Sequence, residues 1–437
     1  MKVLFIDLFS SFLDLAQRCV EAGHEVRWFQ GKLKDGTPSP VGRGLIPRIP
    51  AWESSMRWAD LIVLSDNARW LPALESYRRR GFPIFGPNLD VAQWELDREC
   101  GQQVFEAHGI ETAPRETFRS IREARACLMQ RPGRYVSKPN ADEDKSLSYV
   151  SKSARDMMFM LDKWEKAGKI KTSFTFQKFV PGIEFAVGGW MGRDGFIGPW
   201  LENFEHKKLM NDEIGPNTGE MGTVLKYVRE SLLADLLLRP VEAELIRQGY
   251  TGYIDAAAII REDGTPMPLE WTARPGWPLT QILQCLHKGD PVEWMADALM
   301  GRDTLDVTNE VAAGVVLALP DFPYSRLPRE AVSGFPVYGA QRIPKRHFHP
   351  AEMMAGPVWD MDKGRLYQRT GLVTAGDYVC IVTGAGKTVS VAREQAYKHV
   401  DMLEMPNSPL YRTDIGCRVE RKLPELRALG YCAGWPA

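Results

Sequence analysis

The sequence lacks the features that would draw a protein to a nucleic acid or a membrane. Its formal net charge is -1 over 437 residues, so no overall field attracts it to a charged polymer or surface. No apolar stretch approaches the roughly 20 residues that a transmembrane helix needs. The start, MKVLFIDLFSS, turns polar too soon for a signal peptide. We therefore expect small-molecule partners and leave monomer and homodimer both open.

Paired cysteine motifs are also missing. The seven cysteines are scattered, and none forms a CxxC pair. This distribution argues against a common zinc site and against a disulfide scaffold, and it fits a reducing cytoplasm. The cysteines are Cys19, Cys100, Cys127, Cys285, Cys380, Cys417 and Cys432.

The N-terminal part of the chain alternates between apolar runs and stretches with helical spacing of apolar residues. Such alternation predicts a parallel, doubly wound sheet in the N-terminal part. A nucleotide-binding first turn would carry glycine, but residues 8–11 read Leu-Phe-Ser-Ser, so we predict no dinucleotide site. The expected strands are 1–7, 25–29, 60–64 and 82–86, and the expected helices are 12–23 and 71–80.

Two changes of pattern suggest domain boundaries. Pro114 breaks the chain after a helical stretch, and from residue 311 short strands with turns predict a separate α+β module. Between them, an amphipathic helix is expected over 231–248. Lys138 ends an apolar strand directly before a polar loop, which suits a cation that meets phosphate; a merely solvated lysine is the alternative.

The segment Asp255–Gly276, DAAAIIREDGTPMPLEWTARPG, predicts a β-hairpin around a Gly-containing turn. Strand alternation puts Glu270, Thr272 and Arg274 on one face and Leu269, Trp271 and Ala273 on the core face. Mg²⁺ takes one or two carboxylates plus phosphate oxygens, and Arg binds phosphate bidentately. A metal–polyphosphate site would satisfy the polar face; a surface hairpin with an exposed Glu–Arg pair is the alternative.

Residues 215–222, GPNTGEMG, are too rich in glycine and proline for a helix or a central strand. Such a segment brings backbone N–H groups close to a ligand, so we predict a binding loop, with an ordinary connecting loop as the alternative. Residues 383–388 look like a phosphate-binding loop, but Ile381 replaces its first glycine, and we predict a strand-to-helix turn. His347 and His349 lie in a basic loop and are expected at the surface.

These motifs, in this order, resemble phosphoribosylamine–glycine ligase (glycinamide ribonucleotide synthetase) of the ATP-grasp superfamily. GPNTGEMG is similar to that family's GPNTGGMG, and EHKK at 205–208 to its DHKR. The hairpin, FPIFGPN at 82–88, residues 91–93 and RTDIG at 412–416 also match, so the resemblance spans nearly the whole chain.

The resemblance implies a mixed α/β and α+β fold in four parts. It implies a Rossmann-like domain over 1–113, ATP-grasp subdomains over 114–180 and 181–310, and a C-terminal α+β domain over 311–437. It also implies the reaction: ATP phosphorylates a carboxylate, and an amine attacks the acyl phosphate to give an amide. Positioning and charge neutralisation dominate such catalysis.

Site residues follow from the resemblance position by position. Lys138, Lys145, Gln177, Lys178, Glu184 and Arg274 would bind ATP, and Glu270 and Thr272 would hold Mg²⁺ or Mn²⁺. Arg274, Lys207 and Asn217 would act in catalysis. The substrate side would comprise Gly215, Pro216, Asn217, Thr218, Gly219 and Asp255.

The chain also departs from the family pattern. The ATP loop, 139–147, has no glycine and three acids, and only Lys145 matches. Thr272 stands where the family has Asn, Gln102 stands where a lysine is expected with Arg98 nearby, and the PGWPL segment 275–279 lacks two carboxylates.

Three explanations remain open. The chain is a ligase that joins glycine or another amino acid to an amine other than phosphoribosylamine. Alternatively, it is an authentic phosphoribosylamine–glycine ligase of purine biosynthesis, or a non-catalytic nucleotide-binding relative. The presence of both Glu270 and Arg274 favours an enzyme.

Overall fold

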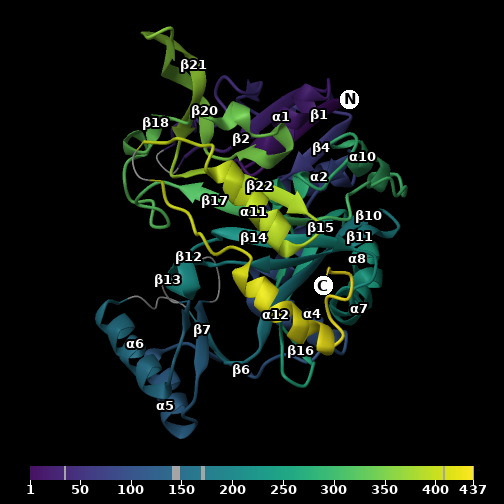
Figure 1. Cartoon of the computed structure of the whole chain (residues 1–437). Coiled ribbons are helices and arrows are strands. Elements are labelled where there is room, and N and C mark those ends of the chain that lie inside the picture. Colours follow the sequence, from purple (N-terminus) through teal and green to yellow (C-terminus); the bar gives the residue numbers. More distant parts are fainter. Residues whose placement is uncertain (34–35, 140–147, 169–172, 407–408, 437) are drawn as a thin grey trace.

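The computed structural model describes residues 1–33, 36–139, 148–168, 173–406 and 409–436. Three bodies are visible in Figure 1: a parallel sheet near the N-terminus, a large central sheet, and a small lobe that stands away from both. Among the described residues, no helix combines the length and the apolar character needed to cross a bilayer.

The N-terminal body is a five-stranded sheet in the order β3-β2-β1-β4-β5, with every pair parallel. Apolar runs form its inner strands because both faces are covered, as in other parallel sheets. The doubly wound sheet predicted from the sequence is therefore confirmed. Its elements are β1 (Lys2–Asp7), α1 (Leu13–Glu21), β2 (Glu25–Gln30), β3 (Arg48–Ile49), β4 (Leu61–Leu64), α2 (Leu71–Arg78) and β5 (Ile84–Phe85).

The small lobe pairs one antiparallel sheet, in the order β6-β9-β7-β8, with two helices. Ser120 and Ser153 cap the helices, since each side chain accepts a hydrogen bond from a backbone N–H in the first turn. Two helices, α3 (Leu89–Leu96) and α4 (Arg98–Ala107), lead into the lobe. The lobe contains β6 (Arg115–Phe118), α5 (Ile121–Gln130), β7 (Tyr135–Pro139), β8 (Tyr149–Val150), α6 (Ala154–Lys166) and β9 (Phe174–Lys178).

The central body is an antiparallel sheet in the order β16-β15-β10-β11-β14-β17-β22-β19. β17 pairs with β14, so the boundary predicted at residue 311 does not coincide with a break in the sheet. The strands are β10 (Ile183–Gly192), β11 (Gly195–Glu205), β14 (Gly222–Val228), β15 (Gly252–Ile260), β16 (Pro266–Thr272), β17 (Val311–Ala318), β19 (Phe348–Pro350) and β22 (Tyr378–Gly386).

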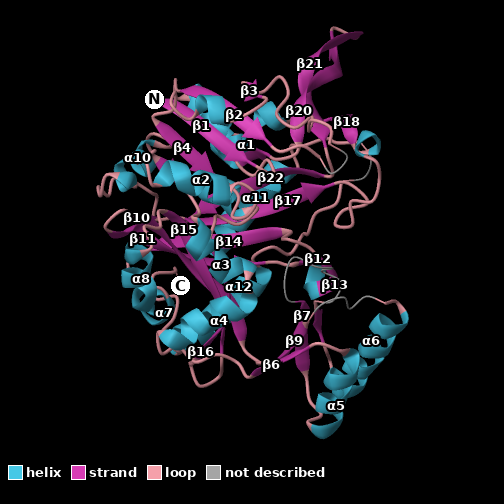
Figure 2. Cartoon of the chain, turned by 180° about the vertical axis from the view of Figure 1, so that it is seen from behind, coloured by secondary structure: helices cyan, strands magenta, loops and turns pink. Residues whose placement is uncertain are grey.

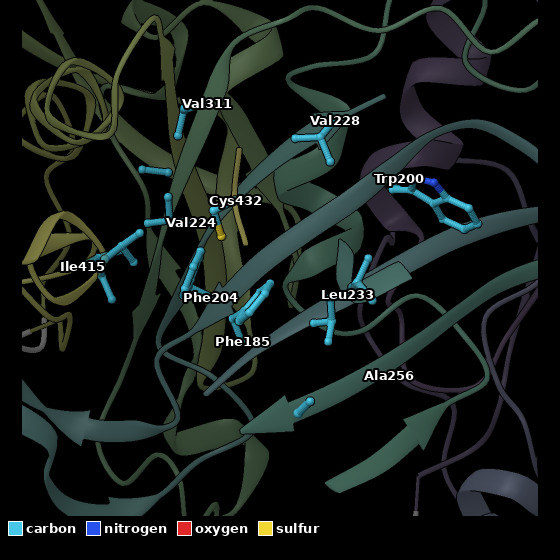
Figure 3. Close-up of a cluster of buried hydrophobic side chains, with 14 of the residues drawn as sticks. Phe185, Trp200, Phe204, Val224, Val228, Leu233, Ala256, Val311, Ile415 and Cys432 are labelled. Carbon is cyan, nitrogen blue, oxygen red and sulfur yellow. The ribbon is translucent and has the colours of Figure 1, made fainter. Parts of the chain in front are cut away.

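Helices cover the central sheet (Figure 2). Buried apolar side chains such as Phe185, Phe204, Val224 and Ala256 form the core on one face (Figure 3). The single helix predicted over 231–248 is wrong, because it is broken by a 3₁₀ turn that contains Pro240. The helices are α7 (Leu232–Leu237), α8 (Glu242–Arg247), α9 (Leu279–Gln284), α10 (Glu293–Leu299), α11 (Val389–Val400) and α12 (Cys417–Ala428).

Smaller elements complete the fold. A two-stranded hairpin joins β12 (Lys208–Met210) to β13 (Ile214–Asn217), and a three-stranded sheet contains β18 (Ser333–Pro336), β20 (Met353–Asp362) and β21 (Arg365–Ala375). Short 3₁₀ turns lie at Glu53–Ser55, Asn211–Glu213, Arg239–Val241, Arg329–Ala331, Ala340–Arg342 and Lys345–His347.

Two minor predictions have opposite outcomes. Residues 383–388 do lead from β22 into α11, with Thr388 as the helix cap. The surface position expected for His347 and His349 is wrong, since both are buried against Thr383, and the Nδ1 of His349 lies 2.8 Å from Asp14. The neighbouring Lys345 and Arg346 are exposed, so the composition of this segment does not indicate the burial of the two histidines.

Candidate active site

One face of the central sheet carries polar side chains at its β16 edge. Strand register places Glu270 beside Ala257 and Thr272 beside Asp255. Because directly paired residues point to the same side, all four share a face. This face is the floor of the candidate site.

Small residues continue this floor onto β10. Ala257 pairs with Ala186, and Asp255 pairs with Gly188. Ala186 in turn pairs with Asn203 on β11. The small side chains leave room above the sheet between the polar ones, which is what a ligand lying across the strands requires.

The face assignment predicted for the hairpin holds from residue 270 onward. Trp271 and Ala273 are buried, while Glu270, Thr272 and Arg274 are half-buried. At Leu269 the alternation fails, because β15 residues 257 and 258 face residues 270 and 268, which leaves Leu269 as the extra residue of a bulge.

Glu270 faces positive charge. Its Oε2 lies 2.9 Å from Nη1 of Arg98, and its side chain keeps 43% of its exposure. Burial acts to raise the pKa of Glu270, but the charges of Lys138, Lys207 and Arg98 outweigh it and lower that pKa to about 2. The carboxylate is therefore ionised and accessible.

Lys138 lines the same pocket as Glu270 and Gln177. Burial lowers the pKa of Lys138 to about 8, against the opposing effect of Glu270. Lys138 lies near the end of strand β7, as expected from the sequence, and its contact with phosphate stays a prediction. Lys145 and the acidic loop 140–147 lie outside the described residues.

Lys207 connects the floor to the glycine-containing segment. Its Nζ lies 2.8 Å from Oε1 of Glu184 and 3.0 Å from Oε2 of Glu205. Its backbone carbonyl accepts hydrogen bonds from the N–H and the Oγ1 of Thr218, at 2.7 and 3.0 Å. The positive charge of Lys207 is the main cause that lowers the pKa of Glu184.

Two deeper carboxyl groups lie behind Lys207. Burial, followed by the charge of Glu205, raises the pKa of Glu220 well above its usual value. Burial and the charge of Glu205 also raise the pKa of Asp255 to about 7. Asp255 Oδ2 accepts hydrogen bonds from Asn203 Nδ2 and from the hydroxyl of Tyr253, both at 3.0 Å.

The rest of the segment 215–222 is arranged as the edge of a hairpin. Gly215, Pro216 and Asn217 belong to β13, where Asn217 is exposed and pairs with Lys208. Gly219 is exposed, and a side chain there would meet no atom within 4 Å. These groups border the site near Lys207 rather than lining its floor.

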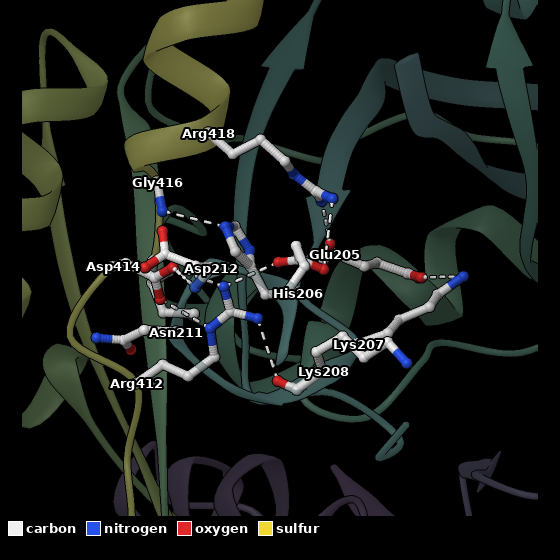
Figure 4. A network of polar contacts seen from close by, with 12 residues as sticks. Glu205, His206, Lys207, Lys208, Asn211, Asp212, Arg412, Asp414, Gly416 and Arg418 are labelled. Carbon is white, nitrogen blue, oxygen red and sulfur yellow. Dashed lines mark hydrogen bonds and ion pairs between the residues drawn. The ribbon is translucent and has the colours of Figure 1, made fainter. Parts of the chain in front are cut away.

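A clamp holds that hairpin in place (Figure 4). Arg412 is buried and binds both oxygens of Asp414 at 2.8 Å, Glu213 at 2.8 Å, and the carbonyl of Lys208 at 3.1 Å. Burial lowers the pKa of His206 to about 3, so its neutral ring accepts a hydrogen bond from Gly416 N. Residues 412–416, the RTDIG segment, thus hold the hairpin that borders the site and do not line the site themselves.

Three further predicted residues are Arg274, Lys178 and Gln177, of which Gln177 lines the pocket with Glu270. Arg274 pairs with Glu95 at 2.9 Å, and the N–H of Ala273 donates to the same carboxylate at 2.8 Å. Lys178, at the end of β9, is exposed, while the neighbouring Gln177 is buried.

The donor set suits a magnesium ion that arrives with phosphates. Glu270 supplies one ionised carboxylate, and Thr272 adds a neutral hydroxyl on the same face. Mg²⁺ binds well through one carboxylate plus substrate phosphates and water. No cluster of three or more His, Cys, Asp or Glu within the described ranges could hold a metal without such a ligand.

Two site residues, Glu95 and Glu205, were not predicted from the sequence. Glu95 lies on α3, far along the chain from Arg274, and no local motif marks it. Glu205 begins the EHKK run, so its contact with Lys207 had a visible signal. Gln102 donates to the carbonyl of Leu269 at 3.1 Å, and its Oε1 is buried without a partner in the described part of the chain.

The chain is similar in sequence and in fold to several known proteins. No protein-family model matches the chain. It is 27% identical to phosphoribosylamine–glycine ligase of Ralstonia nicotianae, across 80% of this chain and 82% of that protein. It is 28% identical to the Lactococcus lactis enzyme of that name, across 79% and 80%.

A solved structure of similar fold is phosphoribosylamine–glycine ligase from Thermotoga maritima, with a TM-score of 0.70, 20% identity, and coverage of 95% of this chain and 100% of that one. A second is the ADP complex of N5-carboxyaminoimidazole synthetase from Staphylococcus aureus, with a TM-score of 0.56, 12% identity, and coverage of 91% and 97%. The chain shares its fold with these two enzymes, as expected from the sequence.

Proposed function

Because this chain is a diverged relative of the phosphoribosylamine–glycine ligases and shares their ATP-grasp fold, we propose that it is an ATP-dependent carboxylate–amine ligase. The observation that carries the proposal is the polar floor of the central sheet. There, an ionised Glu270 faces Lys138 in one pocket, with Lys207 close enough to lower its pKa. Charged side chains gathered in one partly exposed pocket suit a ligand that carries phosphates and a metal ion.

The chemistry proceeds in two steps that balance. A carboxylate oxygen of the acid substrate attacks the terminal phosphorus of ATP, and ADP leaves. The amine nitrogen then attacks the acyl carbon, inorganic phosphate leaves, and the nitrogen loses a proton. The chain contributes mainly position and charge, as in other phosphoryl transfers.

We assign roles to the predicted residues that lie within the described ranges. Lys138 and Arg274 bind phosphate oxygens, while Gln177, Lys178 and Glu184 border the nucleoside. Glu270 and Thr272 would hold Mg²⁺, which supplies charge neutralisation at the phosphates when bound. Lys207 stabilises charge on the transferred group, and Asn217 and the substrate residues 215–219 and 255 border the acid and amine.

We propose glycine or another amino acid as the acid and an amine other than phosphoribosylamine as the acceptor. The first turn of the N-terminal sheet, which has no glycine, supports a changed acceptor. Authentic phosphoribosylamine–glycine ligase is the second candidate, favoured by the similarity to enzymes of that name over about four-fifths of the chain.

An ADP-release screen tests both candidates. Amino acids are combined with amine acceptors under Mg-ATP, and phosphoribosylamine is generated in place as one acceptor. Turnover with another amine supports the first candidate, and turnover with phosphoribosylamine alone supports the second. ATP binding without ADP release under any combination would contradict both and favour a non-catalytic nucleotide-binding protein.

A further inference from the structure

A buried carboxylate occupies the first turn of the N-terminal sheet. Asp7 ends β1, directly before the turn into α1, and it has no solvent exposure. Ser10 in this turn has a φ of 63°, in the left-handed region that a serine rarely adopts. The two amides that follow Ser10 point at Asp7.

Four donors converge on this carboxylate. Ser11 N donates to Oδ1 at 3.0 Å, and Phe12 N donates to Oδ2 at 2.8 Å. Trp28 Nε1 donates to Oδ2 at 3.1 Å, and Ser65 Oγ donates to Oδ1 at 2.6 Å. Burial raises the pKa of Asp7, and all four hydrogen bonds oppose that rise, because they stabilise the ionised form.

These donors occupy a place where parallel α/β sheets bind anions. The amides of Ser11 and Phe12 directly precede α1, with Phe12 as its N-cap residue, and β1 lies next to the point where the strand order reverses, between β1 and β4. Helix N-termini and such switch points attract phosphate in this fold class. Here the chain's own carboxylate takes the donors that a phosphate would need.

We propose that Asp7 is a built-in anion that closes this cradle to phosphate, so that the acceptor amine carries no phosphate group here. The proposal rests on the proposed ligase function and specifies its acceptor class. A phosphate brought close to Asp7 would meet a like charge and saturated donors, both of which disfavour binding.

Helix α9 also contacts this turn. Gln281 Nε2 donates to the carbonyl of Ser11 at 2.9 Å, which brings α9, just after Arg274, against the turn. In the described part of the chain, Gln281 Oε1 is buried without a partner.

Calorimetry on the whole protein tests the proposal directly. Ribose 5-phosphate and inorganic phosphate are titrated while a non-hydrolysable Mg-ATP analogue occupies the nucleotide site. We expect no saturable binding by the wild type. Saturable binding of either probe with a Kd below about 1 mM would overturn the proposal.

Asp7→Ala provides a gain-of-binding test. The substitution frees the four donors, so inorganic phosphate should raise the Tm of the variant and leave that of the wild type unchanged at matched ionic strength. A folded variant with no phosphate-dependent shift would also overturn the proposal. If the variant does not fold, the wild-type titration alone decides.

The control is Asp60→Ala. Asp60 is exposed at the opposite end of the sheet, where it accepts a hydrogen bond from Lys2 N at 2.8 Å, so its loss removes one carboxylate without opening the cradle. Its Tm should not respond to phosphate. Failure of ADP release would count against the ligase function, whereas phosphate binding by the wild type would count against the closed cradle alone.

Discussion

Two carboxylates, Glu270 and Asp7, stand at the ends of strands in two different bodies of this protein. The side chain of Glu270 is 43% exposed, and it faces the positive charges of Lys138, Lys207 and Arg98. Asp7 has no exposure and four hydrogen-bond donors. The Glu270 carboxylate is therefore accessible to a ligand. The Asp7 carboxylate, in our proposal, occupies the position that a bound phosphate would take.

The contrast shows where divergence has acted. Around Glu270 the charges expected for ATP chemistry are present, although Thr272, Gln102, the PGWPL segment 275–279 and the glycine-free loop 139–147 depart from the family pattern. At the β1–α1 turn the residue types differ, although the backbone still presents its amides. The two regions therefore differ in how much of their charge is available to a ligand.

Glu270→Gln should have the largest effect. It removes the ionised carboxylate that faces Lys138 and Lys207, and we expect ADP release to fall by about 100-fold or more, as for other losses of preorganised charge at a reacting phosphate. The measurement is carboxylate-dependent ADP release. Glu262→Gln, at the exposed turn of the same hairpin, is the control and should retain full activity.

Lys138→Ala should weaken nucleotide binding next most. A charge-assisted hydrogen bond to phosphate is worth about 1.5–3 kcal/mol, so the Kd for Mg-ATP should rise by roughly 10-fold to 100-fold. Nucleotide titration measures this, with exposed Lys166→Ala on α6 as the control. An unchanged Kd in the Lys138 variant would show that the lysine does not meet the phosphates.

The pH dependence of nucleotide binding should be smaller. Because the pKa of Lys138 is lowered to about 8, the free protein loses this positive charge as pH rises through 8. Mg-ATP affinity should therefore fall from pH 7 to pH 9, by at most about 10-fold for one group. Titrations of wild type and Lys138→Ala across this range check it: the fall should be absent from the variant.

Thr272→Asn should have the smallest effect. It exchanges one neutral oxygen ligand for another, so we expect ADP release to change by no more than about threefold. Steady-state kinetics at varied Mg²⁺ measure this. A loss as large as that of Glu270→Gln would mean that the hydroxyl has a role other than metal binding.

The sequence was most informative where strand alternation is regular. The polar positions 270, 272 and 274 and the core position of Trp271 follow directly from a period of two. The bulge at Leu269 was not predictable, because it depends on how β16 pairs with β15.

Contacts between segments that are far apart in the sequence could not be predicted either. Residues 222–226 pair with residues 311–315, so the change of pattern at 311 does not interrupt the sheet. His349 is buried through its partner Asp14, which is 335 positions away. The pair Glu95–Arg274 is of the same kind, since neither side chain has a local sequence signal for the other.

The central claim is that a magnesium-bound triphosphate lies on the polar floor of the central sheet. A crystal structure with Mg²⁺ and a non-hydrolysable ATP analogue tests it most directly. We predict phosphate oxygens within hydrogen-bond distance of Lys138 Nζ and a metal ion bound to the Glu270 carboxylate. Nucleotide bound elsewhere, with Glu270 still paired to Arg98, would contradict the account.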